Sequence, residues 1–119
     1  MAFEDDFETL LQLVEPKVAA MARKVTTTVQ RIRPDFVPKV SLAWQTVNFH
    51  HPKAKFVNAV YLRTNTVYLV FQDGRLLDSK LLVDDGKVKR VRWIPFRPGD
   101  KIPTDEIAIL IAEAVALRM

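Results

Sequence analysis

The sequence contains no cysteine, and this absence removes several kinds of chemistry at once. Disulfide bonds, thiolate nucleophiles, cysteine-ligated zinc and iron–sulfur clusters all need the missing side chain. Histidine is scarce as well, because His50 and His51 are the only two. In an extended segment neighbouring side chains point apart, so this pair does not easily share one metal ion. We interpret both histidines as loop residues ahead of Pro52.

Glycine and long apolar runs are also rare. The three glycines are isolated, and the sequence has no phosphate-binding loop, dinucleotide-binding fingerprint or G-x-S-x-G nucleophile motif. The apolar run over residues 107–112 ends at Glu113, well short of the roughly 18 residues that cross a membrane. The N-terminus is acidic, whereas a secretion signal begins with basic and apolar residues. We therefore expect a cytoplasmic protein with no membrane contact, and we favour a non-enzymatic role.

The residues that are present are typical of one globular domain. The 119 residues are 49% hydrophobic and 27% charged, which is an ordinary balance for a domain of this size. The net charge of +4 is unevenly distributed, since residues 1–16 hold five acids and no base while residues 17–40 hold six bases and one acid. A positive balance favours weak attraction to polyanions.

The beginning of the chain predicts helices. Apolar residues recur at helical spacing on both sides of Pro16, from Phe3 to Val14 and from Val18 to Ile32. Because proline suits the first turn of a helix and damages its interior, we predict two helices, over about residues 4–14 and about residues 16–33. Together they form an N-terminal helical segment, residues 1–33.

The middle of the chain predicts a sheet region, residues 46–96. Residues 56–62 and 67–71 are valine-rich and aromatic runs joined by a polar turn, as in a β-hairpin. Both faces of these runs are largely apolar, which favours strands covered on both sides. A short helix is expected over residues 36–44 and another strand over residues 87–94. The large aromatic residues of this region are expected mostly in the core: Trp44, Phe49, Phe56, Tyr61, Tyr68, Phe71 and Trp93.

A C-terminal helix is predicted over residues 103–118, with acids in its first turn and Arg118 in its last, as the helix dipole favours. Ile109 and Leu117 lie opposite its apolar stripe, so they are either additional core or a self-association surface that would make a homodimer. These elements predict an α+β fold. It is a single-domain antiparallel β-sheet with N-terminal and C-terminal helices packed on it, over residues 1–119.

Three arginines in the basic strand and its continuation, residues 87–97, are the candidate ligand or nucleic-acid site: Arg90, Arg92 and Arg97. Cations that alternate with aromatic residues can contact phosphates and stack on single-stranded bases. An alternative interpretation is that the basic residues mark an exposed edge strand. Trp93 shares a strand face with Val91 and is expected to pack inward, which favours this alternative.

Asp5 and Glu8 are the candidate metal site, because their spacing puts two carboxylates on one helical face. Carboxylate oxygens bind hard cations such as iron, calcium and magnesium. Acids near the start of a helix are also expected from the helix dipole alone, without any ligand.

Four segments stand in an order that matches a known pattern: VSLAWQTVNF (residues 40–49), NTVYLVFQDGRLLD (65–78), GKVKRVRWIPF (86–96) and IPTDEIAILIAEAV (102–115). This order resembles the YdhG-like family of small bacterial domains of unknown function, although Gln45 stands where many members have glycine. The resemblance implies a small α+β domain with helices packed on an antiparallel sheet. Some relatives are described as frataxin-like iron chaperones, so iron enters only with that alternative, and otherwise no cofactor is expected.

The leading hypothesis is a non-enzymatic cytoplasmic binding or interaction module whose partner is unknown. The first alternative is a frataxin-like iron chaperone or metal carrier that uses Asp5 and Glu8. The second is a weak nucleic-acid-binding protein that uses residues 87–97.

Overall fold

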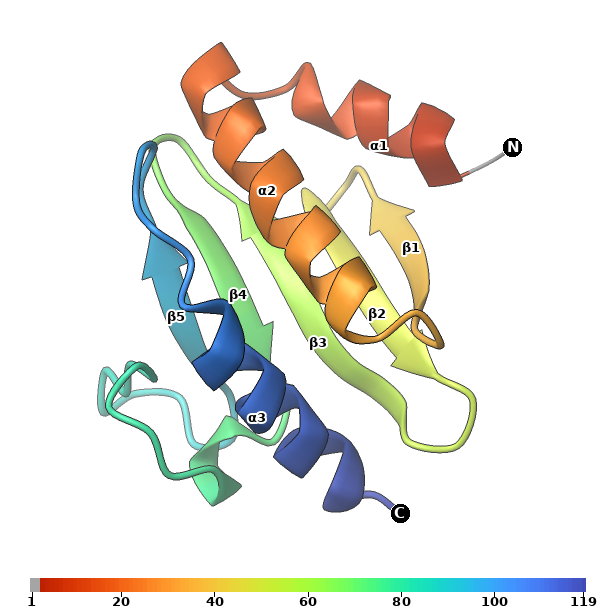
Figure 1. Ribbon diagram of the computed structural model, residues 1–119. Coiled ribbons are helices and arrows are strands. Elements are labelled where there is room, and N and C mark those ends of the chain that lie inside the picture. Colours follow the sequence, from red (N-terminus) through yellow and green to blue (C-terminus); the bar gives the residue numbers. More distant parts are fainter. Residues whose placement is uncertain (1–2) are drawn as a thin grey trace.

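The computed structural model describes residues 3–119, which form three α-helices and a five-stranded antiparallel sheet in one α+β domain (Figure 1). The predicted fold class is therefore confirmed. The elements in chain order are α1 (Phe3–Leu11), α2 (Pro16–Ile32), β1 (Val37–Ser41), β2 (Thr46–His51), β3 (Lys55–Leu62), β4 (Val67–Phe71), the 3-10 turn η1 (Gly74–Leu76), β5 (Arg92–Phe96) and α3 (Thr104–Ala116). None of the helices within residues 3–119 has the length and apolar character needed to span a bilayer.

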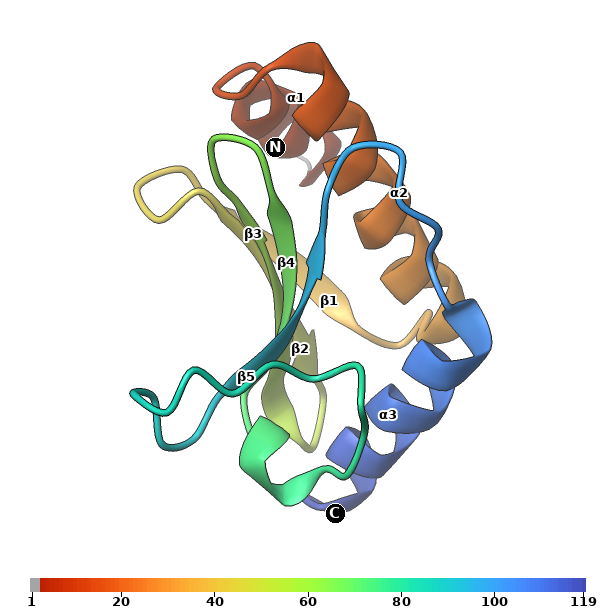
Figure 2. The same ribbon diagram turned by 90° about the vertical axis from the view of Figure 1, so that its left-hand side faces the viewer.

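Each strand of the sheet pairs with its neighbour in the sequence, so the strand order is β1-β2-β3-β4-β5. The register places Val47, Val60, Leu69 and Ile94 side by side across four strands. A register shift between Phe49 and His50 interrupts the pairing of β2 with β3. Figure 2 shows all three helices on one side of the sheet, so the sheet has one covered face and one face without helices.

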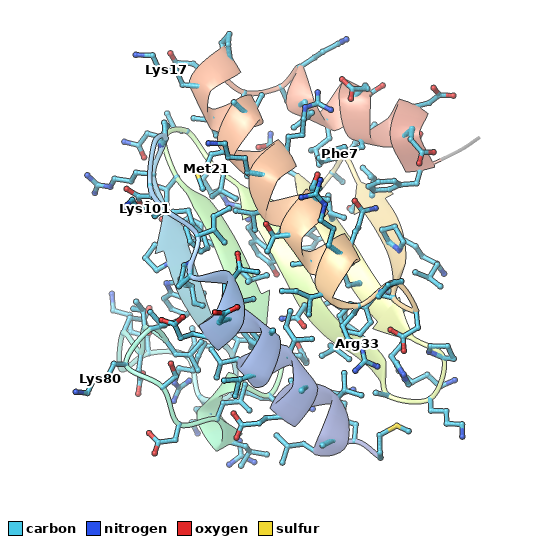
Figure 3. The ribbon with its side chains drawn as sticks, in the orientation of Figure 1. Phe7, Lys17, Met21, Arg33, Lys80 and Lys101 are labelled. Atoms are coloured by element: carbon cyan, nitrogen blue, oxygen red, sulfur yellow. The ribbon has the colours of Figure 1, made fainter. Side chains whose placement is uncertain are left out.

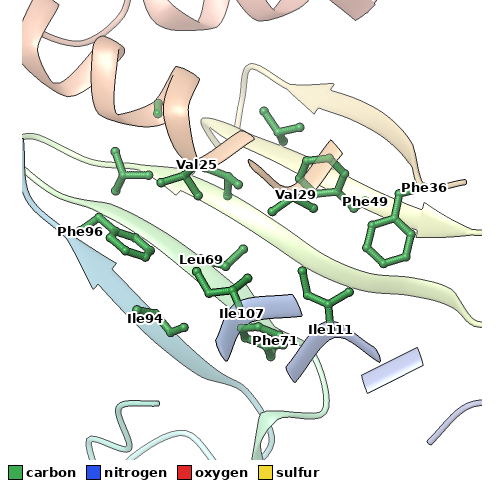
Figure 4. Packing of buried hydrophobic residues seen from close by; sticks show 14 of the residues in the cluster. Val25, Val29, Phe36, Phe49, Leu69, Phe71, Ile94, Phe96, Ile107 and Ile111 are labelled. Carbon is green, nitrogen blue, oxygen red and sulfur yellow. The ribbon is translucent and has the colours of Figure 1, made fainter. Parts of the chain in front are cut away.

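The core lies between the sheet and the helices. Charged side chains such as those of Lys17 and Lys101 extend outward from the helical side (Figure 3). Figure 4 shows Val25 and Val29 of α2, and Ile107 and Ile111 of α3, directed toward Phe49, Leu69 and Phe71 of the sheet. All seven side chains are at most 1% exposed. The predicted apolar stripes of α2 and α3 therefore form the helical half of the core.

The predicted helix boundaries are close to the observed ones, because proline and acidic residues mark the helix starts. Pro16 occupies the first turn of α2, and Asp105 with Glu106 occupies the first turn of α3. These residues suit the unpaired N–H groups and the positive dipole at a helix start.

The predicted short helix over residues 36–44 is wrong, and the sheet starts earlier than residue 46. Val37–Ser41 form β1, in which Val40 pairs with Val47 of β2 on the covered face. The turn that follows is closed by Gln45, whose positive φ of 53° is incompatible with a continuing right-handed helix. Packing against β2 therefore overrides the helical spacing of this stretch.

The predicted strand over residues 87–94 is also wrong in its first half. Residues 87–91 belong to the connection between η1 and β5, and β5 starts at Arg92. The Asp85 carboxylate accepts hydrogen bonds from the backbone N–H groups of Lys87 (2.8 Å) and Val88 (3.2 Å). These bonds hold the chain in a turn at the place where the strand was expected.

Candidate binding face of the sheet

The face of the sheet without helices, called here the helix-free face, carries aromatic and polar side chains in register. One row across the strands contains Thr46, Tyr61, Tyr68 and Pro95, and the next contains Asn48, Ala59, Val70 and Trp93. Tyr61 and Tyr68 lie directly opposite each other on β3 and β4. Both tyrosines and Trp93 are half-buried rather than enclosed. The helix-free face is thus an accessible aromatic surface.

This arrangement corrects two predictions about the aromatic residues. The strands β3 and β4 are covered by helices on one side only (Figure 2). Phe49 and Phe71 are core residues as predicted, whereas Trp44 is 74% exposed and Tyr61 and Tyr68 are half-buried. The expectation that most of these aromatic residues lie in the core is therefore wrong. Phe56 and Trp93 are half-buried on the helix-free face, so the expected inward packing of Trp93 is wrong.

Two shallow hollows on the helix-free face share the side chain of Tyr61. The first has a volume of about 360 Å³ and lies between Tyr61, Tyr68 and Trp93 and the η1–β5 connection, which contributes Val88 and Val91. The second has a volume of about 510 Å³ and lies on the other side of Tyr61. Its lining is more polar: Ser41, Trp44, Thr46, Asn48, His50 and Phe56. A ligand with several planar groups can therefore extend across Tyr61 from one hollow to the other.

Arg63 fixes the boundary between these hollows. Its guanidinium carbon lies 4.8 Å from the centre of the Tyr61 ring, within the range of a cation–π interaction. Its Nη1 also donates hydrogen bonds to the carbonyl oxygens of Leu62 (2.8 Å) and Trp44 (3.2 Å). The turn that carries the exposed Trp44 is consequently tied to the end of β3.

The two histidines end β2, where a loop was predicted, and their side chains have separate roles. His50 contacts Phe56 on the helix-free face, with 5.5 Å between the ring centres. Burial and, to a smaller extent, the charge of Lys39 lower the pKa of His50. The Nδ1 atom of His51 accepts hydrogen bonds from the backbone N–H groups of Lys53 (3.1 Å) and Ala54 (3.0 Å). His51 is therefore a structural residue of the β2–β3 turn.

The charge of the helix-free face is positive because acids are missing from most of the sheet. No Asp or Glu occurs from Phe36 to Gln72, a stretch that includes β1, β2, β3 and β4. Lys39 lies on this face opposite Asn48, and the exposed Lys87 and Lys89 flank Val88 at the first hollow.

Two carboxylates of the neighbouring connection, those of Asp84 and Asp85, are already engaged, whereas the exposed Asp78 forms no ion pair among residues 3–119. Asp84 lies 3.2 Å from the Arg92 guanidinium. Hydrogen bonds from backbone N–H groups hold the pKa of the Asp85 carboxyl below its ordinary value. Their negative charges are thus partly compensated by local partners, and the lysines of this connection carry its accessible positive charge.

The three arginines of the predicted basic site do not form one surface. Arg90 pairs with Asp73 at 2.8 Å, and Arg92 donates to the carbonyl oxygens of Val88 (3.0 Å) and Val91 (2.7 Å) while it pairs with Asp84. Arg97 is exposed beyond the end of β5. Two of the three guanidiniums therefore hold the η1–β5 connection rather than face a ligand.

The predicted metal residues are not brought together with further ligands. Both oxygens of Glu8 accept hydrogen bonds from Arg23, at 2.8 and 3.1 Å, and this contact lowers the pKa of Glu8. Asp5 is exposed on α1. In the part of the chain that the structure describes, residues 3–119, no three His, Cys, Asp or Glu side chains come together as a metal site requires.

The sequence does not indicate the helix-free face as a site, because the strands that form it are apolar on both sides. The alternation of Val47 and Phe49 with the polar Thr46 and Asn48 was a usable indication that one face of β2 is open. On β3 and β4 only the tyrosine hydroxyl groups distinguish this face, and that difference is small.

No family model matches the chain, and neither a curated protein nor a solved structure shows significant similarity to it. Membership of the YdhG-like family therefore stays a prediction from the sequence.

Proposed function

We propose that the protein is a non-enzymatic binding domain of the cytoplasm whose helix-free face binds single-stranded nucleic acid. The observation that carries the proposal is the accessible pair of Tyr61 and Tyr68, with Trp93 in the next row, on a sheet whose first four strands contain no acidic residue. The proposal keeps the nucleic-acid alternative and moves it from the arginines of residues 87–97 to the open face of the sheet.

The aromatic side chains provide the stacking part of such a site. Antiparallel sheets of RNA-binding domains stack splayed bases on exposed aromatic rings. Each base–aromatic stack contributes roughly 1–3 kcal/mol and tolerates different bases. Tyr61, Tyr68 and Trp93 supply rings at the first hollow, while Trp44 and Phe56 supply rings at the second.

The cations around the aromatic rings provide the phosphate part. Lys39 lies on one side of the face, Arg63 just beyond the end of β3, and Lys87 with Lys89 beside the first hollow. Each phosphate contact with a single strand contributes about 0.7 to the slope of log affinity against log salt. Engagement of three or four of these cations predicts a slope of about −2 to −3.

An extended strand fits this face better than a duplex. The aromatic rings can stack only on bases that are unpaired and turned toward the sheet. The Asp5 and Glu8 pair has no comparable support as an iron site, because Glu8 is occupied by Arg23.

The test is fluorescence anisotropy with labelled oligonucleotides of about ten nucleotides, a length within the usual range of such sites. Single-stranded DNA and RNA are expected to bind more tightly than duplex DNA, with the salt slope given above. Tyr61→Ala combined with Tyr68→Ala is expected to weaken binding about tenfold or more.

A matched pair of charge variants places the site on one face. Lys39→Ala and Lys17→Ala each remove one exposed cation, from the helix-free face and from the start of α2 respectively. Only Lys39→Ala is expected to reduce affinity by more than about twofold at low salt. Equal losses from the two variants, or saturable binding of duplex DNA alone, would contradict the proposal.

A further inference from the structure

The outer surface of the helical layer, opposite the helix-free face, is divided into a basic and an acidic half. Residues 16–32 of α2 include Lys17, Lys24 and Arg31 and contain no acid. Residues 104–116 of α3 include Asp105, Glu106 and Glu113 and contain no base. Both helices lie on the same side of the sheet (Figures 1 and 2). One side of the molecule thus presents two helices of opposite charge.

These charges are not used within the chain. Lys24, Arg31, Asp105, Glu106 and Glu113 are all exposed, and none of them forms an ion pair among the residues that the structure describes. Arg23 differs, because Glu8 of α1 binds it. The unpaired charges are therefore available to a partner.

The acidic helix also exposes apolar surface. Ile109 is 62% exposed and Leu117 is 48% exposed, and the small side chains of Ala112 and Ala116 lie between them on the outer side of α3. These four side chains follow one another along the helix, and a contiguous exposed apolar patch is typical of a protein contact. A groove that could receive this apolar surface lies beside the basic helix α2. One wall of this groove of about 650 Å³ is formed by Arg23, Lys24, Thr27, Thr28 and Arg31, and the other by Gly99, Asp100, Lys101 and Ile102. Asp100 is the one acid of this lining, and its carboxylate accepts a hydrogen bond from the backbone N–H of Arg97.

We infer that this surface is the interface of a two-fold symmetric homodimer, in which α3 of each copy lies on the α2 groove of the other. A two-fold interface must be self-complementary, so that each half of the surface meets the other half on the partner. The helical layer meets this requirement because its basic groove and its acidic, apolar helix lie side by side on one face. Ile109 would fill the groove between Thr28 and Ile102, and the acids of α3 would meet Lys24, Arg31 and Lys101.

The inference is independent of the proposed nucleic-acid site, which lies on the opposite face of the sheet. The dimer is tested by measuring the mass of the protein in solution, free of nucleic acid, by light scattering and sedimentation at about 0.05 M and about 0.5 M salt. A mass of twice 13.6 kDa is expected at low salt, with weaker association at high salt because exposed charges are screened.

Charge reversal provides the sharpest test. Lys24→Glu with Arg31→Glu places acidic side chains at the groove as well as on α3, and Glu106→Lys with Glu113→Lys places basic side chains on α3 as well as at the groove. Each double variant alone is expected to be monomeric, with association weakened about 100-fold or more, because like charges then meet at both halves of the interface. An equimolar mixture of the two variants is expected to recover the dimeric mass, since opposite charges face each other again.

The control for folding is the thermal midpoint of each variant, because all four positions are exposed. Ile109→Lys is expected to weaken the dimer at any salt concentration, since it removes the apolar contact and places a cation at the basic groove. A wild-type chain that stays monomeric at low salt, or a dimer that survives both charge reversals, overturns the inference. So does a mixture that stays monomeric, or a mass that rises only when a polyanion is added.

Discussion

Arg63 stacks on the ring of Tyr61, with 4.8 Å between the guanidinium carbon and the ring centre. The same side chain holds the carbonyl oxygen of Trp44 at 3.2 Å. One residue thus orients an aromatic ring shared by both hollows and also fixes the turn that carries the most exposed tryptophan. Arg63 is therefore expected to contribute to binding through the position of Tyr61 and of the Trp44 turn, and not through its charge alone.

Substitution of Arg63 is expected to lower affinity for single-stranded oligonucleotides in the order wild type, Arg63→Lys, Arg63→Ala. Lysine keeps the positive charge but loses the planar stack on Tyr61 and the guanidinium hydrogen bonds to Leu62 and Trp44. Alanine loses the charge as well as these contacts. The effect on stability should stay within about 1 kcal/mol, because the cation–π contact is partly exposed. Anisotropy titrations with urea denaturation distinguish the two effects. Equal affinities of the lysine variant and the wild type would show that charge alone matters.

His50 is expected to make oligonucleotide binding depend on pH. Its pKa is lowered by burial and by Lys39, so the ring takes up a proton at lower pH than an ordinary histidine does. A bound polyanion favours the charged ring, and affinity should therefore rise as the pH falls from about 7.5 to about 5.5. His50→Gln should flatten this part of the profile. An unchanged profile in the variant would remove His50 from the site.

The same shift has the opposite sign for the stability of the unbound protein. Because the folded pKa of His50 lies below the unfolded one, the unfolded chain takes up the proton first as the pH falls. The free energy of unfolding should therefore decrease as the pH falls through about 6.5. His50→Gln should reduce this decrease, as measured by urea denaturation at pH values on either side.

Asp73 joins the sheet to the end of α3. It accepts hydrogen bonds from Arg118 and Arg90, and Arg118 also donates to the carbonyl oxygen of Ala54 at 3.0 Å. The Arg118 hydrogen bond makes the largest contribution to the lowered pKa of Asp73, followed among the favourable contacts by that of Arg90. Asp73→Asn should destabilise the fold by about 1.5–3 kcal/mol at pH 7.

Acid should erase this difference between wild type and Asp73→Asn. A carboxyl with a lowered folded pKa stabilises the protein above its unfolded pKa, and the contribution disappears as the pH falls through the folded value. Denaturation at a series of pH values from 7 down to about 2 follows the loss of this difference. Arg90→Ala is the control, because this partner is 56% exposed and should cost less than about 1 kcal/mol.

Gly74 is required by the close approach of η1 to β5. A Cβ atom at this position would lie 2.4 Å from the Cβ of Arg92 and 2.6 Å from its backbone nitrogen. Gly74→Ala should therefore force a backbone shift and cost about 1–3 kcal/mol. Gly86→Asn is the matched control, since this position has a φ of 76°, open space around it and a replacement that tolerates the left-handed region. Equal thermal midpoints for Gly74→Ala and wild type would contradict the close contact.

The helices and the central hairpin could be predicted from the sequence because their determinants are local. Pro16, the acids at the start of α3 and the polar turn before Val67 each specify an element boundary without long-range contacts. β1 could not be recognised in this way, because Val37 and Val40 become strand residues only through pairing with β2. The start of β5 is set by the turn that Asp85 stabilises, and this turn competes with a strand pattern of similar strength.

The candidate site was harder to predict than the fold. Tyr61 and Tyr68 are core or surface residues depending on which face of the sheet α2 and α3 cover. Because β3 and β4 are largely apolar on both faces, their sequences do not show which face that is. The sequence predicts Arg90 and Arg92 as binding residues because of their charge. In the folded chain, however, Asp73 pairs with Arg90 and Asp84 pairs with Arg92. Site prediction therefore failed where tertiary pairing decides exposure.

The consecutive order of the strands has a consequence for how the chain folds. Hairpins β1–β2, β2–β3 and β3–β4 each close through a short connection, so most of the sheet can form quickly from local contacts. β5 must instead wait for closure of the connection over residues 72–91, whose entropy cost is larger. α3 leaves the ribosome after all five strands, and Phe71 has no cover from Ile107 and Ile111 until then (Figure 4). The nascent protein therefore passes through a stage in which the sheet exposes the part of its future core that α3 later covers.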